Sequence, residues 1–226
     1  MAFYKMISNL EFSHALLDFD GTLANTLPVL YQAFQDFLRK YNITPTREKF
    51  DSLNGPSLLE ICQTLKRDHQ LTPDPETLLA QYKMIIDQKY HHANPLEGAD
   101  LFLQTLMTHK VSIHMVTSNT KDHIEPLLEK FGWKSIFTSF TYGNEVETSK
   151  PDPAIYELSW KKTKSSTKKN VFVVEDSAHG VCASHHAGFI TFAIAGLSQH
   201  PILLEAGAEK TFTNFDTLMD YLLKVS

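Results

Sequence analysis

Four short polar stretches, spread widely along the chain, contain the side chains best suited to chemistry. Together they supply four carboxylates, one lysine and several hydroxyl and amide groups, in Asp18-Phe19-Asp20-Gly21-Thr22, Thr117-Ser118-Asn119, Ser149-Lys150-Pro151-Asp152-Pro153 and Glu175-Asp176-Ser177. Carboxylates brought close together resist joint ionisation, and a hard cation such as Mg²⁺ relieves their repulsion. A lysine beside them adds positive charge and a phosphate contact. We therefore expect a site for phosphoryl transfer, which depends mainly on positioning and charge neutralisation.

Each stretch also has an ordinary structural interpretation. An aspartate at a strand end is often a turn residue, and Ser118 alone is typical of a helix N-cap. Lys150 alone is typical of a surface lysine, and Glu175-Asp176 alone of a solvated turn. The order of the four stretches, and their positions after strands, favour the shared catalytic site.

Apolar runs typical of buried strands position these stretches. We predict strands over residues 14–19, 111–117, 136–142, 170–174, 189–194 and 211–213, the last a short edge strand. Helical patterns lie between and after them, over residues 98–109, 122–131, 153–162, 180–187, 201–206 and 215–223. Strands that are apolar throughout and alternate with helices predict an α/β fold, a Rossmann-like parallel sheet covered by helices on both faces. Ligands of such sheets bind beyond the carboxyl ends of the strands, where the polar stretches would meet.

A helical block interrupts this pattern directly after the first strand. Between about residues 29 and 94 apolar residues recur at helical spacing in three segments, the second after Gly55-Pro56 and the third after Pro73-Asp74-Pro75. We predict an α/β core of residues 1–24 and 95–226, with a small inserted helical cap of residues 25–94. The stretch 1–10 fits either an extra strand or a mobile arm.

The composition excludes several classes of protein. The 226 residues include 42% hydrophobic and 21% charged residues, which is typical of a globular chain. The net charge is −5 without a long basic run, so we expect no nucleic-acid partner. The chain shows neither a signal peptide nor a long apolar span, and its two cysteines, Cys62 and Cys182, lie far apart. We expect a cytoplasmic protein that is a monomer or homodimer and does not bind membranes.

Taken together, the four stretches resemble the motifs of a known family. DFDGTL at 18–23, TSN at 117–119, SKPDP at 149–153 and VVEDSAHG at 173–180 are similar to the four motifs of the haloacid dehalogenase-like hydrolases. The resemblance runs from about Phe12 to about Ala195, and this combination of motifs is highly specific. The helical block resembles the C1-type cap of the phosphoglycolate phosphatase and β-phosphoglucomutase branch.

The resemblance implies a role for each motif residue. Asp18 resembles the nucleophile that forms an aspartyl-phosphate, and Asp20 the acid and base that serves the leaving oxygen and then water. The predicted phosphate contacts are Ser118, Asn119 and Lys150, and Lys150 is also expected to touch Asp18. The predicted Mg²⁺ ligands are Asp18, Asp20 through its backbone carbonyl, Glu175 and Asp176. We expect structural roles for Thr22 and Ser177.

Single residues distinguish between several reactions that members of this family catalyse. Dehalogenases do not need the second aspartate, so Asp20 favours phosphate esters. The mutases carry a cap histidine twelve residues after the nucleophile, where this chain has Leu30. We predict hydrolysis of a small phosphate monoester, with a β-phosphoglucomutase-like mutase as the alternative. A non-catalytic sensor of phosphorylated ligands is a third possibility, although no catalytic residue is missing.

The substrate is the least determined prediction. Candidate cap contacts are Asn25, Tyr31, Asn54, Gly55 and Ser57. Asn54-Gly55 fits a substrate-specificity loop and a plain helix connection equally well. Phosphoglycolate or a small sugar phosphate is the predicted substrate. The group His179, His185 and His186 fits solvated or packed histidines better than a metal site, because Mg²⁺ prefers oxygen ligands.

Overall fold

Six parallel strands form one sheet in the computed structural model, which describes residues 12–53 and 56–224. The strands are β1 His14–Leu17, β2 Ser112–Thr117, β3 Ser139–Tyr142, β4 Val171–Glu175, β5 Ile190–Ile194 and β6 Lys210–Phe212. Their spatial order is β3-β2-β1-β4-β5-β6, so β1 and β4 lie side by side at the centre. The predicted α/β fold with a parallel sheet is confirmed.

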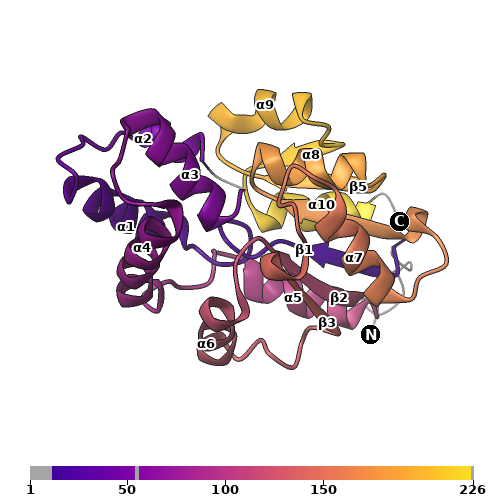
Figure 1. The fold of residues 1–226 in the computed structure, drawn as a ribbon. Helices are drawn as coiled ribbons and strands as arrows, with labels where there is room; N and C mark the ends of the chain where they lie inside the picture. The colour runs from indigo at the N-terminus through magenta and orange to yellow at the C-terminus, as the bar shows by residue number, and fades with distance from the viewer. Residues whose placement is uncertain (1–11, 54–55, 225–226) are drawn as a thin grey trace.

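The strand side chains are buried on both faces, as a covered parallel sheet requires. Leu17 of β1 and Val174 of β4 join one hydrophobic cluster, and their neighbours Leu16 and Val173 join another. The first face is covered by α5 Ala99–Thr108, α6 Lys121–Phe131 and α10 Phe215–Lys224, and the second by α7 Ala154–Thr163 and α8 Ala178–His186. The last short helix is α9 His200–Glu205. The two-layer covering is visible in Figure 1.

Most predicted elements are found with their ends shifted by one or two residues. β3 begins three residues later than predicted, at Ser139, and β1 already ends at Leu17. Helix α8 begins at Ala178 because the hydroxyl of Ser177 accepts a hydrogen bond from the Gly180 backbone N–H and caps the helix.

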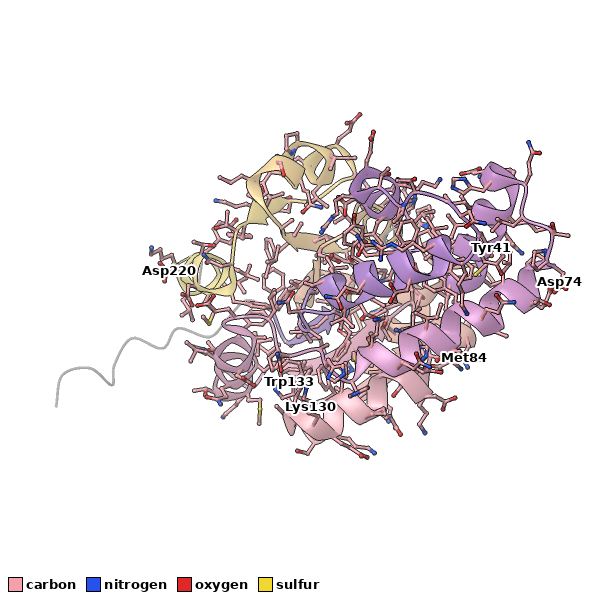
Figure 2. The ribbon with its side chains drawn as sticks, turned by 90° about the vertical axis from the view of Figure 1, so that its left-hand side faces the viewer. Tyr41, Asp74, Met84, Lys130, Trp133 and Asp220 are labelled. Atoms are coloured by element: carbon pink, nitrogen blue, oxygen red, sulfur yellow. The ribbon has the colours of Figure 1, made fainter. Side chains whose placement is uncertain are left out.

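Four helices make up the block between β1 and α5: α1 Leu27–Arg39, α2 Arg47–Asp51, α3 Leu58–His69 and α4 Pro75–Tyr90. The short α2 was not predicted, since five residues show too little periodicity. The block has its own aromatic interior, in which the rings of Phe37 and Tyr82 stack with centroids 4.6 Å apart. Figure 2 shows Tyr41, Asp74 and Met84 on this block, at the end of the molecule opposite Asp220.

The chain enters and leaves the helical block at one place. Ala24 and Pro95 form an antiparallel bridge, and the backbone N–H of Asn25 donates to the carbonyl of Asn94 at 2.8 Å. The two crossings thus lie side by side at the predicted boundaries of the cap. The division into core and cap stays a prediction, and the stretch 1–10 lies outside the described residues. Within the described residues no helix is both long enough and apolar enough to span a lipid bilayer.

Candidate active site

Lys150 holds two carboxylates together at the carboxyl end of the sheet. Its Nζ atom lies 2.7 Å from Oδ1 of Asp18 and 2.6 Å from Oε1 of Glu175. Asp18 directly follows β1, Glu175 ends β4, and the loop before α7 supplies the lysine. All three side chains are buried, and Lys150 is only 2% exposed. A buried charge of either sign needs such partners, so the three groups stabilise one another.

The ionisation of the two carboxyl groups differs because their partners differ. Burial and the nearby Glu175 raise the pKa of Asp18 to about 7, although Lys150 opposes the shift. Burial would also raise the pKa of Glu175, but Lys150 and the hydroxyl of Tyr156, 2.7 Å away, hold it below its ordinary value. Glu175 also accepts hydrogen bonds from Asp176 N–H and Ser177. Glu175 is therefore fixed in position as an anion.

Asp176 completes a group of three buried carboxylates with Asp18 and Glu175. One oxygen atom from each lies within 4.8 Å of the others. One lysine cannot neutralise three carboxylates, and the all-oxygen donor set matches the ligands that Mg²⁺ prefers. Glycine is required beside this group, because Gly21 has φ +82° and a Cβ atom there would lie 2.2 Å from Oδ2 of Asp176.

Asp20 lines the same cavity as Asp18 and Asp176 but is held by different partners. Its carboxylate accepts a hydrogen bond from the hydroxyl of Tyr90, in the last turn of α4, and another from Nδ2 of Asn119 at 3.3 Å. The side chain therefore lies between the helical block and the loop after β2. The ligand predicted from Asp20 was its backbone carbonyl, and that assignment stays a prediction.

Asn119 connects the site to α4 through a histidine. Its Oδ1 atom lies 2.7 Å from Nδ1 of His123, and Nε2 of His123 lies 2.5 Å from Oδ1 of Asp87. His123 lies in the first turn of α6, and Asn119 directly precedes Thr120, the residue before that helix, so the contact ties the loop after β2 to the start of α6. This chain of contacts joins α6 to α4 of the helical block.

A second set of contacts joins α3 to the Lys150 loop. Glu60 receives hydrogen bonds from the backbone N–H and hydroxyl of Ser57, which cap α3, and it also accepts one from the hydroxyl of Ser149. The backbone N–H of Ser57 lies 3.3 Å from the Ser149 hydroxyl. Polar contacts therefore close the helical block onto the core on both sides of the site.

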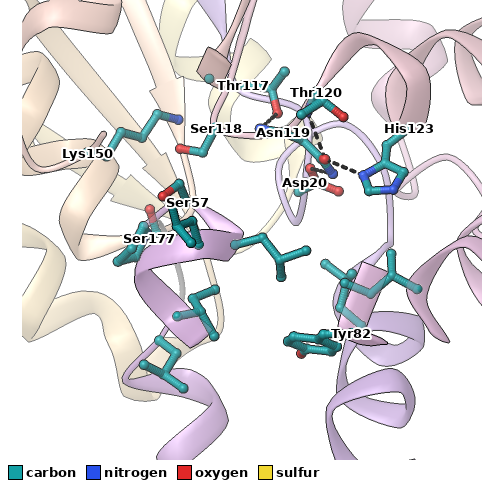
Figure 3. Close-up of a pocket in the computed structure, with 18 of the residues that line it drawn as sticks. Asp20, Ser57, Tyr82, Thr117, Ser118, Asn119, Thr120, His123, Lys150 and Ser177 are labelled. Carbon is teal, nitrogen blue, oxygen red and sulfur yellow. Dashed lines mark hydrogen bonds between the residues drawn. The ribbon is translucent and has the colours of Figure 1, made fainter. Parts of the chain in front are cut away.

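A cavity of about 450 Å³ lies between the helical block and the core. The predicted residues Asp18, Asp20, Ser118, Asn119, Lys150 and Asp176 all line it, as Figure 3 shows for Asp20, Ser118, Asn119 and Lys150. Ser57 lines it too, whereas Asn25 and Tyr31 do not. Asn54 and Gly55 lie outside the described residues. His185 and His186 are exposed on α8 and do not line the cavity.

Several residues at this site were not predicted from the sequence. They are Ser149, Tyr156 and His123 of the core and Glu60, Asp87 and Tyr90 of the helical block. The spacing of His123 from Asn119, and the place of Ser149 next to Lys150, are signals that could have indicated two of them. Tyr90 and Asp87 are brought to the site only by the way α4 packs.

Comparison with known proteins gives a consistent result. The haloacid dehalogenase-like hydrolase family matches residues 15–194 of the chain. A bifunctional riboflavin kinase/FMN phosphatase of Arabidopsis thaliana is 25% identical over 214 residues, which cover 94% of this chain and 54% of the plant protein. This chain thus spans about half the length of that relative.

Two further matches span nearly the whole of both chains. A phosphoglycolate phosphatase of Haemophilus influenzae is 26% identical over 227 residues, covering 95% of this chain and 100% of the relative. The crystal structure of a hydrolase from Pseudomonas syringae superimposes with a TM-score of 0.82 at 19% identity, covering 95% and 99% of the two chains. The likeness to this structure concerns the fold.

Proposed function

This chain belongs to the haloacid dehalogenase-like hydrolase family as a phosphatase-type enzyme, and we propose that it hydrolyses phosphate monoesters of small molecules with the help of Mg²⁺. The observation that carries the proposal is the buried contact of Lys150 with Asp18 and Glu175, beside Asp176. This arrangement concentrates charge at the end of β1, where a phosphoryl group could reach Asp18 from the cavity. The alternative of a bare acid–base site would not need three buried carboxylates.

The proposed reaction has two steps that use Asp18 and Asp20. A carboxylate oxygen of Asp18 bonds to phosphorus while the ester P–O bond breaks, and the carboxyl group of Asp20 gives its proton to the departing alcohol oxygen. Asp20 then takes a proton from water, whose oxygen bonds to phosphorus and releases Asp18 and inorganic phosphate. The hydrogen bonds from Tyr90 and Asn119 hold Asp20 at the cavity wall for both proton transfers.

The remaining residues bind and neutralise the phosphoryl group in this proposal. Lys150, Ser118 and Asn119 lie along the cavity at the carboxyl end of the sheet and would contact phosphate oxygens. Asp18, Glu175, Asp176 and the backbone carbonyl of Asp20 would hold Mg²⁺. When bound, the ion supplies positive charge that offsets the carboxylates and the phosphate.

The cavity wall favours hydrolysis over mutase chemistry. Leu30 lines the cavity at the position where the mutase branch is expected to carry its cap histidine. A leucine cannot exchange protons with a sugar hydroxyl. Among the described cap residues that line the cavity there is no histidine, and His123 belongs to the core.

Turnover of p-nitrophenyl phosphate tests this proposal. We expect the purified protein to release p-nitrophenol with Mg²⁺ and to stop when the metal is chelated. Asp18→Asn should lower kcat by about a thousandfold or more while circular dichroism stays unchanged. Asp122→Asn is the matched control, because Asp122 lies exposed in the first turn of α6. Equal turnover by the wild type and Asp18→Asn, or turnover without metal, contradicts the proposal.

A further inference from the structure

We infer that the substrate's alcohol part is an extended apolar body that contains a ring, and not the small acid or sugar expected from the sequence. The inference rests on the proposed phosphatase function and specifies its substrate class. Its basis is the division of the cavity into a charged end and an apolar end. The phosphate would lie at the charged end, among Asp18, Lys150 and Asp176.

The apolar end is formed by the helical block. All four of its helices contribute side chains to the wall, almost all of them hydrocarbon, among them Leu27, Leu30, Phe50, Leu58, Ile61 and Leu79. Figure 3 shows the wall extending from Asp20 and Ser57 towards Tyr82. Such a wall contacts a ligand by dispersion and by removing apolar surface from water.

Polar groups on this wall are few. Among the described cap residues that line the cavity, the only hydroxyl groups are those of Ser57 and Tyr82, and the only charge is that of Lys83. Ser57 is already engaged with Glu60 and Ser149. The polar lining residues of the core, such as Asn119 and Thr120, gather instead near the phosphate end.

This distribution discriminates between classes of alcohol. Each hydroxyl of a polyol that is buried here without a partner would lower the affinity by about tenfold, because it loses its bonds to water. An aromatic ring loses no such bonds, and it can lie against the partly exposed side chains of Leu30 and Leu79. Apolar atoms placed against this wall are therefore favoured over hydroxyl groups at the same positions.

The size of the cavity points the same way. A volume of about 450 Å³ falls within the range of sites that bind drug-sized molecules. A two- or three-carbon phosphate ester would fill only a small part of it and would leave the apolar wall in contact with water. A ring system fills the space and displaces water from the apolar wall. Its binding also excludes water from the phosphate end of the cavity.

Two esters of primary alcohols provide the test, since their leaving groups are chemically alike. With Mg²⁺ and the full-length protein, we expect kcat/KM for 2-(1-naphthyl)ethyl phosphate to exceed that for glycerol 3-phosphate by about a hundredfold or more. Glucose 6-phosphate and phosphoglycolate should resemble glycerol 3-phosphate. Hydrolysis of all four esters can be followed by one assay, the release of inorganic phosphate.

A polar substitution in the wall should remove the preference. Leu79→Asn, which nearly conserves shape, is expected to reduce the ratio of the two kcat/KM values by about tenfold, and Ile61→Thr, which keeps the branch at Cβ but is one carbon shorter, should reduce it in the same direction. Leu101→Asn is the matched control, because Leu101 is 55% exposed on α5 and does not line the cavity. That variant should keep the wild-type ratio.

The outcomes separate this inference from the function on which it rests. A preference for the naphthyl ester that falls in both wall variants supports the inference. Equal or faster turnover of glycerol 3-phosphate, glucose 6-phosphate or phosphoglycolate overturns it and leaves the phosphatase function standing. Failure to hydrolyse any ester, p-nitrophenyl phosphate included, overturns the proposed function and this inference with it.

Discussion

Tyr90 and Asp20 are joined by a hydrogen bond although they lie in different parts of the molecule. The phenol donates from the last turn of α4 to the carboxylate in the loop after β1. Burial and the charge of Asp20 raise the pKa of Tyr90 well above its ordinary value, so the hydroxyl stays protonated. The same oxygen lies 3.4 Å from Nδ2 of Asn119. The helical block thereby helps to orient the residue proposed as acid and base.

Tyr90→Phe removes this hydroxyl and keeps the ring that fills the space. A hydrogen bond to a charged group contributes about 1.5–3 kcal/mol, so we expect kcat/KM for p-nitrophenyl phosphate to fall by about tenfold or more. The loss should appear mainly in kcat, because Asp20 acts in proton transfer and not in binding the phosphate. Steady-state kinetics with Mg²⁺ measures both constants.

Tyr41→Phe is the matched control for this substitution. The hydroxyl of Tyr41 donates to Oε1 of Gln81 at 2.6 Å, within the helical block and away from the cavity. This variant should change thermal stability slightly and keep the wild-type kcat. Similar kinetics in both variants would contradict a role for Tyr90 in positioning Asp20.

The sheet and its edge could be predicted because their causes are local. The run of residues in β4, Val-Phe-Val-Val-Glu, is apolar enough to require cover on both faces, and the strand order then places the ends of β1 and β4 side by side. The meeting of Asp18 with Glu175 follows from this register. The contact of Lys150 with Asp18, expected from the family resemblance, is also present at 2.7 Å.

The contacts between the helical block and the rest of the chain could not be predicted, because they depend on how the helices pack in three dimensions. Glu60 and Ser57 form a capping box that the sequence pattern allows, yet nothing local shows that Glu60 also reaches Ser149. The same holds for Asp87 and His123, which lie 36 positions apart. The apolar character of the cavity could not be predicted either. In the sequence, Leu30 and Leu79 follow the same pattern as leucines that pack inside a helical bundle.

Gly180 is expected to be essential for the carboxylate group. An added Cβ atom there would lie 1.9 Å from Oε1 of Glu175, which is buried and held by Lys150 and Tyr156. Gly180→Ala should displace Glu175, and we expect it to lower turnover of p-nitrophenyl phosphate by about tenfold or more and to destabilise the fold by about 1–3 kcal/mol. Urea unfolding and steady-state kinetics measure the two effects.

Gly196→Ala provides the comparison, because no atom lies within 4 Å of a Cβ atom at that position and its φ is −62°. It should leave both activity and stability near the wild-type values. If Gly180→Ala behaves like Gly196→Ala, the carboxylate of Glu175 does not need its observed position.

A pair of neighbouring histidines lies on the adjacent strands β1 and β2. His14 Nδ1 lies 3.2 Å from Nε2 of His114, and Nδ1 of His114 lies 2.7 Å from the hydroxyl of Ser139. His114 is 1% exposed, and its burial together with the neighbouring His14 lowers its pKa from 6.5 to about 4. The folded chain therefore keeps His114 neutral at a pH where the unfolded chain protonates it.

Protonation of this site should destabilise the protein as the pH falls from about 6.5 towards 4, because the unfolded state then binds more protons than the native state. Between about pH 7 and pH 5 the His114 contribution to the free energy of unfolding should fall by about 2 kcal/mol.

His114→Asn keeps a polar side chain but cannot gain this proton, so it should lose less stability than the wild type over the same interval. Urea unfolding at both pH values measures the difference, with His92→Asn, an exposed position, expected to follow the wild type. If His114→Asn and the wild type lose the same free energy, the acid sensitivity of the fold lies elsewhere, because removing the buried imidazole removes the group whose protonation the native state resists.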